Sequence, residues 1–410
     1  MTAPPPPHSP YGSRLDRRSL IGAGFAGLAA VAVSPESAIA AGGAKAPPPP
    51  SQPTLCGLFP SSGPEALAGD EAWRGVTLAL DTANRSRPNP IRLIRAEAAD
   101  PTKSIAALAA STPPTACLGT MSSSRSFAAT AAAELANIPY VELDAPADAI
   151  TTRGFKMLHR TGLTTTDLAI RTIAAITGLL APAWHRAPGT LRVALLFDDG
   201  ATDGAFAASM LAQAKQAKLP VLLVMGYASD KLDLSNQVER MQRARIDLLI
   251  HAGRPEHVIL LYEALAIAAW RPRMIIGAGS GYGMSAIGDA LGHRIEHTMV
   301  VDAPLYDKPA QAILRAYRDR YATPPHSSIS LTTYVGTMLV ITALDQGRSL
   351  GAALTALKRK RGALANGWGV DFDADGQNRA SFATLQQWRS GALVTIDPSI
   401  EGAKAPRTSL

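Results

Sequence analysis

The sequence predicts an α/β protein with two lobes, each a doubly wound parallel β-sheet with helices on both faces. Short apolar runs alternate with segments whose apolar residues recur at helical spacing, in one series over residues 54–143 and in a second over 191–301. This alternation is typical of βαβ units. The chain of 410 residues is also long enough for two domains of ordinary size, each with its own core.

Residues 1–40 predict an export signal of the twin-arginine type. Arg14, Arg17 and Arg18 precede an Ala/Gly-rich apolar segment, Leu20 to Val33, which is followed by the small-residue sequence Ala38-Ile39-Ala40. Because about fifteen residues cannot cross ~30 Å of hydrocarbon as a helix, we expect cleavage near Ala40, a periplasmic product and no stable membrane insertion afterwards. A stray apolar helix would leave the arginines unexplained.

Charge and composition exclude other classes of function. The chain has 40 Lys and Arg against 33 Asp and Glu, and removing residues 1–40 takes away three basic and two acidic side chains. The remaining excess is mild and contains no basic run. Nucleic-acid binding would need a concentrated basic face with aromatic residues in it, and aromatic residues are only 5% of the chain. No second apolar segment approaches eighteen residues, so we expect no other membrane span.

The elements follow in chain order after a proline-rich tether, residues 41–53, which should be extended because proline cannot continue a helix or donate to a sheet. The first series predicts strands Thr54–Phe59, Ile91–Ala96, Thr115–Gly119 and Pro139–Leu143, and helices Asp70–Ala83, Lys103–Ala110 and Arg125–Ala136. The second predicts strands Leu191–Phe197, Pro220–Met225, Ile246–Ala252, Met274–Ala278 and His297–Val301, and helices Gly204–Ala217, Leu234–Arg243, Glu256–Ala268 and Met284–Leu291. Helices Pro309–Tyr321 and Leu331–Leu344 should follow, and then a hairpin-type ending made of Gly369–Gly376 and Gly391–Ile396.

The two cysteines, Cys56 and Cys117, each lie in a predicted strand. Neighbouring parallel strands rarely hold their β-carbons in disulfide geometry, so buried free thiols are favoured and a bridge is the alternative. No metal site is expected, since no histidine has suitable spacing.

Several motifs that could carry chemistry are incomplete. Gly277–Gly283 has Tyr282 where the dinucleotide fingerprint needs its last glycine, so no cofactor is expected. Asp371–Gly376 copies half of a calcium loop, but Phe382 stands where a bidentate Glu is needed, which favours an ordinary turn. Ser280 lacks the glycines of a nucleophile elbow. His251 and His257 lie around a strand end and a helix start, where histidines are more often hydrogen-bonded packing residues than ligands.

The order of several short phrases resembles the branched-chain amino acid type of periplasmic solute-binding protein. The phrases are Leu58–Pro64, Asp81–Asn84, Ala99–Pro101, Gly119–Ser123, Asn137–Tyr140, Arg160-Thr161, Phe197–Asp199 and Phe372–Gly376. None is specific alone, but their order and spacing cover nearly all of the chain after residue 40.

This resemblance implies a type I periplasmic-binding fold, in which the chain crosses three times between the lobes and the ligand lies in the cleft between them. The crossings would fall near Arg160, Val301 and Gly369. The implied domains are 54–160 plus 302–368 for lobe 1, 161–301 plus 369–400 for lobe 2, and a tail at 401–410.

The candidate ligand-binding residues lie where the strands end in the two lobes, since α/β sheets bind ligands outside the carboxyl ends of their strands. They are Ser62, Ser122, Ser123, Asp144, Asp203, Arg254, Ser280 and Tyr282. Ser122 and Ser123 begin a helix, where unpaired N–H groups and the helix dipole favour an anion. The alternative for this pair is an N-cap that serves only its own helix. Arg254 could meet an anionic group or be a solvated surface residue.

The resemblance also shows departures from the amino-acid site of the family. Pro146 replaces the usual Thr after the fourth strand, Asp203-Gly204 replaces a Tyr-Gly pair, and Gly279 replaces the acidic residue that holds the ligand's ammonium. An unpaired ammonium in a desolvated site costs several kcal/mol, so branched-chain amino acids are poor candidates. Asp144 and Asp203 could instead hold a cationic group, with Tyr282 as a stacking surface.

Two functions remain open. The resemblance implies a receptor that closes on a small solute and delivers it, as a monomer, to an inner-membrane ABC permease and ATPase complex. The alternative is a periplasmic sensor domain or an enzyme built on the same fold.

Overall fold

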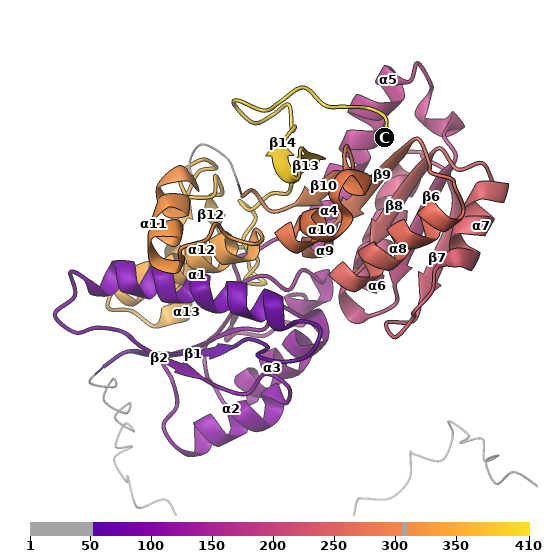
Figure 1. Cartoon of the computed structure of the whole chain (residues 1–410). Helices are drawn as coiled ribbons and strands as arrows, with labels where there is room; N and C mark the ends of the chain where they lie inside the picture. Colours follow the sequence, from indigo (N-terminus) through magenta and orange to yellow (C-terminus); the bar gives the residue numbers. More distant parts are fainter. Residues whose placement is uncertain (1–51, 306–309) are drawn as a thin grey trace, which may run out of the picture. The chain divides into compact units, whose positions relative to one another are not determined.

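The computed structural model describes residues 52–305 and 310–410, whose strands form two separate main sheets (Figure 1). The predicted export signal lies outside the described residues, and so does most of the proline-rich tether. The sheets and the helices that cover them are two α/β lobes, which confirms the predicted fold class.

The first lobe contains a five-stranded parallel sheet in the order β2-β1-β3-β4-β5. Its strands are β1 (Thr54–Leu58), β2 (Arg92–Arg95), β3 (Ala116–Gly119), β4 (Tyr140–Glu142) and β5 (Leu158–Arg160). Its helices are α1 (Ala66–Asn84), α2 (Pro101–Ala110), α3 (Ser123–Leu135), a short turn at Asp148–Ile150, α11 (Gln311–Tyr321), α12 (Ile329–Leu344) and α13 (Leu350–Ala356). Side chains of α1 and α12 form one core against the sheet, and those of α2 and α3 form a second.

The second lobe contains a seven-stranded sheet in the order β14-β13-β10-β9-β8-β6-β7. Its strands are β6 (Val193–Asp198), β7 (Val221–Tyr227), β8 (Leu248–Ala252), β9 (Met274–Ala278), β10 (Met299–Asp302), β13 (Thr384–Arg389) and β14 (Ala392–Thr395). Its helices are α4 (Thr165–Ala175), continued by Ile176–Leu180 and α5 (Ala181–Ala183), then α6 (Ala201–Gln216), α7 (Ser235–Arg243), α8 (Pro255–Ile267), α9 (Ser280–Gly283) and α10 (Ser285–Leu291), with single turns at Pro188–Thr190 and Gly292–Ile295.

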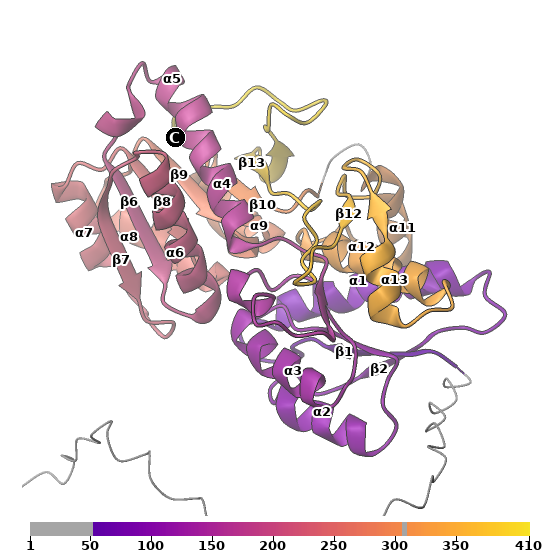
Figure 2. The same cartoon turned by 180° about the vertical axis from the view of Figure 1, so that it is seen from behind.

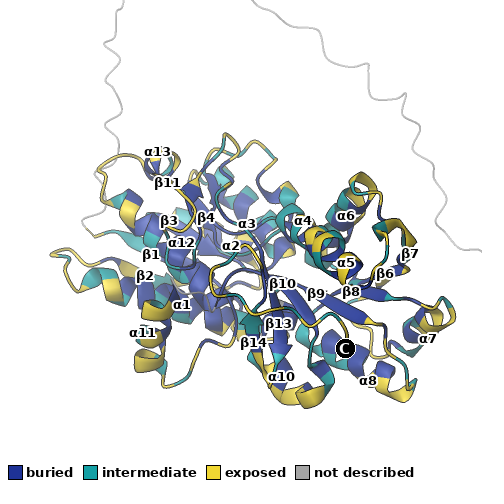
Figure 3. Ribbon diagram, turned by 90° about the horizontal axis from the view of Figure 1, so that it is seen from above, coloured by how far each residue is buried: buried dark blue, intermediate teal, exposed yellow. Residues whose placement is uncertain are grey.

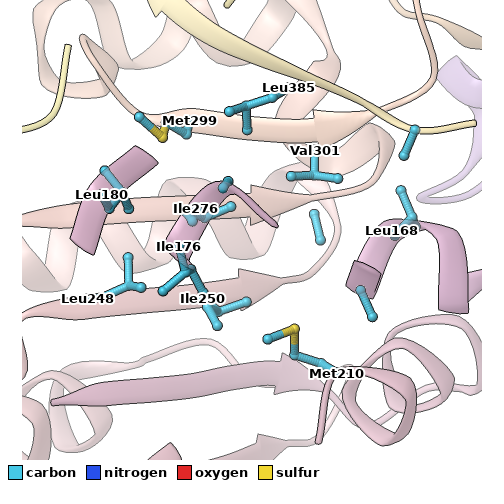
Figure 4. Packing of buried hydrophobic residues seen from close by; sticks show 14 of the residues in the cluster. Leu168, Ile176, Leu180, Met210, Leu248, Ile250, Ile276, Met299, Val301 and Leu385 are labelled. Atoms are coloured by element: carbon cyan, nitrogen blue, oxygen red, sulfur yellow. The ribbon is translucent and has the colours of Figure 1, made fainter. Parts of the chain in front are cut away.

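Two helical layers cover this second sheet. The helices α4 and α6 lie on one face (Figure 2), where Leu168, Ile176 and Met210 pack on strand residues such as Ile250 and Ile276 (Figure 4). The helices α7, α8 and α10 pack on the other face. Strands β8, β9 and β10 are therefore buried along their whole length (Figure 3).

The chain passes three times between the two sheets. It leaves the first sheet after β5 and enters α4, returns after β10 to the α11–α12 segment that packs on α1, and leaves again between β12 (Val370–Asp371) and β13. The strand β12 pairs with β11 (Lys358–Arg359). These passages fall close to the expected positions near Arg160, Val301 and Gly369. The exact domain boundaries stay a prediction.

The buried Arg160 side chain ties the first passage to the third. Its Nε donates to the Gln377 side chain, and its Nη1 donates to the Ala145 and Ala147 carbonyls at 3.2 and 2.7 Å. The Arg160 backbone also exchanges hydrogen bonds with Gly376 and Asn378. Burial lowers the pKa of Arg160 to about 10, so the guanidinium stays protonated at neutral pH.

The structure corrects some expectations. The predicted hairpin is wrong in its pairing, because β14 pairs with β13 and Gly369–Gly376 contributes β12, whose partner is β11. Further elements were not predicted from the sequence, among them β5, β11, β13, α13 and the helical stretch Thr165–Ala183. Contrary to expectation, that stretch of 19 residues is long and apolar enough to cross a membrane by length and composition. Its buried side chains pack in the core of the second lobe, as those of a core helix do.

Two smaller expectations are confirmed. Cys56 and Cys117 are opposite each other on β1 and β3, and both are buried and free. Asp371–Gly376 forms an Asp/Gly turn, in which the Asp373 carboxylate accepts from the backbone N–H groups of Asp375 and Gln377 at 2.9 Å.

A matched pair of helical glycines tests the packing of α1 on α12. A β-carbon at Gly75 would collide with the Thr333 hydroxyl and the Ser330 carbonyl, whereas one at Gly178 would meet nothing within 4 Å. Gly75→Ala should lower the free energy of unfolding by about 1–3 kcal/mol through overpacking. Gly178→Ala should change it little, or raise it by up to about 1 kcal/mol through helix propensity. Urea unfolding measures both, and equal effects would contradict the packing of α1 on α12.

Candidate functional site

A cavity of about 500 Å³ is lined by residues from both lobes. From the first lobe come the turns after β3 and β4 and the start of α1; from the second come the turns after β6, β8 and β9, the end of β10 and the start of α4. Parallel strands thus present their carboxyl ends to one space, as expected for an α/β binding site. The volume suits a small organic ligand.

The turn from β3 into α3 supplies Ser122 to the cavity. Ser122 is the N-cap residue of α3, but its side chain makes no capping hydrogen bond and instead lies 3.0 Å from the Ser124 hydroxyl. The Ser122 hydroxyl therefore does not serve the helix backbone, which disfavours the N-cap alternative. Ser123 is fully buried; its N–H donates to Thr202 Oγ1 of the second lobe at 3.2 Å, and its hydroxyl accepts from the Ala147 N–H at 3.3 Å.

The buried carboxylate of Glu142 holds this turn and the turn after β4 in place. One oxygen accepts from the Thr120 N–H at 2.9 Å and the Ser126 hydroxyl at 2.6 Å. The other accepts from the N–H groups of the next three residues, 143–145, at 3.0–3.2 Å. Burial raises the pKa of Glu142, although these hydrogen bonds oppose the shift.

Asp144 and Asp302 face the cavity from the ends of β4 and β10. Both accept a hydrogen bond from a neutral hydroxyl at the start of α12, Thr332 for Asp144 at 3.1 Å and Ser328 for Asp302 at 2.8 Å. Burial and then repulsion by Asp302 raise the pKa of Asp144 to about 8. Burial raises the pKa of Asp302 to about 6.

Arg254 is engaged by acidic neighbours. Its Nε lies 3.5 Å from Asp198 Oδ2 and 3.1 Å from Glu256 Oε1, and its Nη2 donates to the Ser229 carbonyl. His257 Nδ1 lies 3.1 Å from the same Asp198 oxygen. Burial alone would raise the pKa of Asp198, but hydrogen bonds from His257 and Ser229 hold it at about 2. The Arg254 guanidinium thus lines the cavity while it is paired with two carboxylates of the protein, Asp198 and Glu256.

Asp203 lies in the first turn of α6 and lines the cavity from the second lobe. No hydrogen bond or ion pair from residues 52–305 and 310–410 reaches its carboxylate. Burial and then repulsion by Asp198 raise the pKa of Asp203 to about 7.

The cavity therefore brings together four of the predicted residues, Ser122, Asp144, Asp203 and Arg254. Ser123 lies behind the lining, and Ser62 is exposed outside it. Tyr282 is fully buried, with its hydroxyl 2.6 Å from His251 Nδ1, and its ring packs in the core of the second lobe. The backbone of Ser280 begins α9, and its side chain is outside what the structure describes. The binding roles of all eight residues stay predictions.

Both histidines named in the sequence analysis, His251 and His257, are buried and hydrogen-bonded within the second lobe. His251 bridges the hydroxyls of Tyr227 and Tyr282 inside the core, and burial lowers the pKa of His251 to about 3. In the described part of the chain, no group of three or more His, Cys, Asp or Glu side chains could hold a metal ion.

Sequence reasoning missed three residues of this site, Glu142, Thr202 and Asp302. Asp302 had a usable signal, because a carboxylate ends the otherwise apolar strand Met299–Asp302 at the edge where parallel strands bind ligands. Glu142 had none, since its five donors come from local turn geometry.

Comparison with known proteins agrees with this architecture. A family model described as periplasmic binding protein matches residues 54–392. The Leu/Ile/Val-binding protein homolog 8 of Brucella abortus (strain 2308) is 32% identical over 359 residues, which cover 83% of this chain and 89% of that protein. Homolog 7 of the same strain is 30% identical, covering 83% and 90%.

Solved structures share the fold. The leucine-binding protein LivK from Thermotoga maritima has a TM-score of 0.72 at 15% identity, covering 84% of this chain and 97% of that one. LivJ from Streptococcus pneumoniae, in complex with isoleucine, has a TM-score of 0.72 at 18% sequence identity. The match covers 83% of this chain and 97% of LivJ. A solute-binding protein of R. palustris in complex with benzoate has a TM-score of 0.71 at 16% sequence identity. The match covers 87% of this chain and 99% of that protein.

Glu142→Gln should destabilise the first lobe. The amide nitrogen would face backbone N–H donors that now share a carboxylate, and each buried donor left unpaired costs about 1–3 kcal/mol. Glu134→Gln is the control, because Glu134 is partly exposed and also accepts backbone N–H groups, from Lys156 and Met157. Urea unfolding should show a loss at least twice as large for Glu142→Gln, and equal losses would contradict the role of Glu142.

Asp144→Asn should stabilise the ligand-free protein at pH 8 and change little near pH 4. The folded state holds the Asp144 pKa at about 8, above the ordinary ~3.9, so the folded protein binds this proton more tightly than the unfolded chain does. Stability contributed by Asp144 is therefore present below pH 4 and lost as pH rises towards 8. Asparagine removes that loss.

The expected gain in unfolding free energy at pH 8 is at least about 1.4 kcal/mol, the equivalent of one pKa unit. Urea unfolding at both pH values measures it, with the exposed Asp289→Asn as the control. A gain of the same size at both pH values would show that Asp144 is not protonated in the folded protein.

Proposed function

Because the chain belongs to the periplasmic binding protein family, we propose that it is the substrate-binding receptor of an ABC-type importer. It binds a small organic solute in the cavity between its lobes and closes on it by a hinge motion. The observation that carries this proposal is a cavity of about 500 Å³ lined by both lobes, in a chain that crosses between them three times. The family and its curated relatives are binding proteins and not enzymes. This chain is likewise a binding protein and not an enzyme.

The proposed receptor is exported to the periplasm, loses its signal near Ala40 and works as a monomer that presents its closed form to a permease and ATPase complex. Export is supported by the arginines and the small residues of the first 40 positions. A ligand drives closure only through contacts made to both lobes at once. Such contacts are available, since Ser122 and Asp144 come from the first lobe and Asp203 from the second.

The solute of this receptor is not a simple branched-chain amino acid. Gly279 lines the cavity where the family resemblance expects the acidic residue for the ammonium, and Asp203-Gly204 replaces the Tyr-Gly pair. The curated relatives are named for leucine, isoleucine and valine, while structural neighbours hold isoleucine or benzoate. The fold thus accommodates different solutes, and the cavity side chains decide between them.

A thermal-shift screen of small metabolites tests the receptor function. A receptor gains stability from its solute by mass action, by about 2.7 kcal/mol at a concentration of 100 times Kd. The solute that raises the Tm should be recovered unchanged by mass spectrometry and should reduce the radius of gyration in X-ray scattering. A stabilising solute that leaves the radius of gyration unchanged, or a screen with no stabilising solute, would contradict a receptor that closes on its ligand.

A further inference from the structure

The cavity is strongly acidic. Six carboxylates line it, from Glu65, Asp144, Asp198, Asp203, Glu256 and Asp302, whereas Arg254 is the one basic side chain among the described lining residues. Three of the six have an ion-pair partner inside the protein, because Glu65 pairs with Arg125, and Asp198 and Glu256 share Arg254. The other three, Asp144, Asp203 and Asp302, have no ion pair among residues 52–305 and 310–410.

These three carboxylates are poorly compensated by the surrounding protein. Asp302 has only 7% of its surface exposed and accepts from the Ser328 hydroxyl. Asp144 accepts from the Thr332 hydroxyl, and no described side chain donates to Asp203. A buried charge without a partner costs several kcal/mol. A positively charged ligand would remove that cost, while an anionic ligand would add to it.

The positions of the three residues favour an extended cation over a single ion. Asp144 follows β4 in the first lobe, Asp203 belongs to α6 in the second, and Asp302 ends β10 at a passage between the lobes. In the described part of the molecule they do not form a group that could hold a metal ion. Apolar side chains, including Leu163, Phe206 and Met284, line the rest of the cavity and suit a carbon skeleton.

We propose that the solute is a small organic cation with at least one protonated amino or guanidinium group, held by Asp144, Asp203 and Asp302. This inference rests on the proposed receptor function and names its substrate class. A cation that contacts Asp144 and Asp203 together touches both lobes, so the same charge that binds it also drives closure. Burial raises the pKa of all three carboxyl groups in the ligand-free protein, so binding of the cation releases protons at neutral pH.

Isothermal titration calorimetry of the full chain at pH 8 tests the proposal. The cationic probes are putrescine, agmatine and arginine, and the comparison probes are leucine and benzoate. At least one cation should bind with a Kd in the micromolar range, and leucine and benzoate should bind at least about 100-fold more weakly. Titrations in two buffers of different ionisation enthalpy should show proton release.

Single substitutions locate the cation. Asp203→Asn and Asp144→Asn should each weaken binding of that cation at least about tenfold, which corresponds to 1.4 kcal/mol. Asp289→Asn removes one charge from an exposed position outside the cavity and should leave the Kd within about twofold. Circular dichroism confirms that each variant is folded.

The possible results separate the two proposals. If leucine or benzoate binds and no cation does, the substrate class is wrong and the receptor function stands. If a cation binds equally well to Asp203→Asn, Asp144→Asn and the wild type, the assignment of these residues is wrong. If no probe binds and no metabolite stabilises the protein in the thermal-shift screen, both proposals fail.

Discussion

The site depends on one buried interaction, the set of hydrogen bonds that converge on the Glu142 carboxylate. Five donors from two turns share its two oxygens, so the turn that carries Ser122 and the turn that carries Asp144 are fixed relative to each other. Isolating a carboxylate from water costs several kcal/mol, which hydrogen bonds to charged groups, each worth about 1.5–3 kcal/mol, offset when they are this numerous. The two first-lobe turns at the cavity are therefore tied together by the protein itself.

In the first lobe, neutral hydrogen-bond donors hold the Glu142 carboxylate, whereas in the second lobe an ion pair holds the Asp198 carboxylate. There the Arg254 guanidinium and the His257 ring contact the Asp198 carboxylate at the end of β6, and Arg254 is the one basic side chain among the described residues that line the cavity. Arg160 likewise stabilises the scaffold where the chain passes between the lobes. Its guanidinium donates to backbone carbonyls and to Gln377 and not to a carboxylate. In the described part of the chain these two arginines thus stabilise the scaffold, and the acidic groups that face the cavity without an ion pair are the carboxyl groups of Asp144, Asp203 and Asp302.

The sequence predicted the fold well because periodicity and strand order are local signals. Ten of the fourteen strands in the described part of the chain were located within about two residues, and the three passages between lobes followed from the family resemblance. The strands that could not be predicted are very short or are positioned by contacts distant in sequence. The strand β5 has three residues, β11 and β12 have two each, and the β13–β14 pair is held in the sheet by contacts with residues far away in the chain. At the site, Asp144 and Asp203 could be placed on the cavity from their positions in the family resemblance, whereas the position of Tyr282 in the core depends on packing against Gly277 and His251.

An anion in the cavity could bind at the N-terminus of α3, and a cation could bind at the three carboxyl groups that have no ion pair. The sizes of these two interaction energies decide which charge the cavity prefers. A helix N-terminus contributes about 0.3–1 kcal/mol to a nearby negative charge, and up to about 2 kcal/mol when partly buried. Bringing an anion beside the half-buried Asp144 and Asp203 and the buried Asp302 would require these groups to take up or keep protons, which their raised pKa values favour near neutral pH. At higher pH that accommodation is lost, because the carboxyl groups ionise. The selectivity of this cavity for cations should therefore increase with pH, which a neutral amide-lined cavity of the same shape would not do.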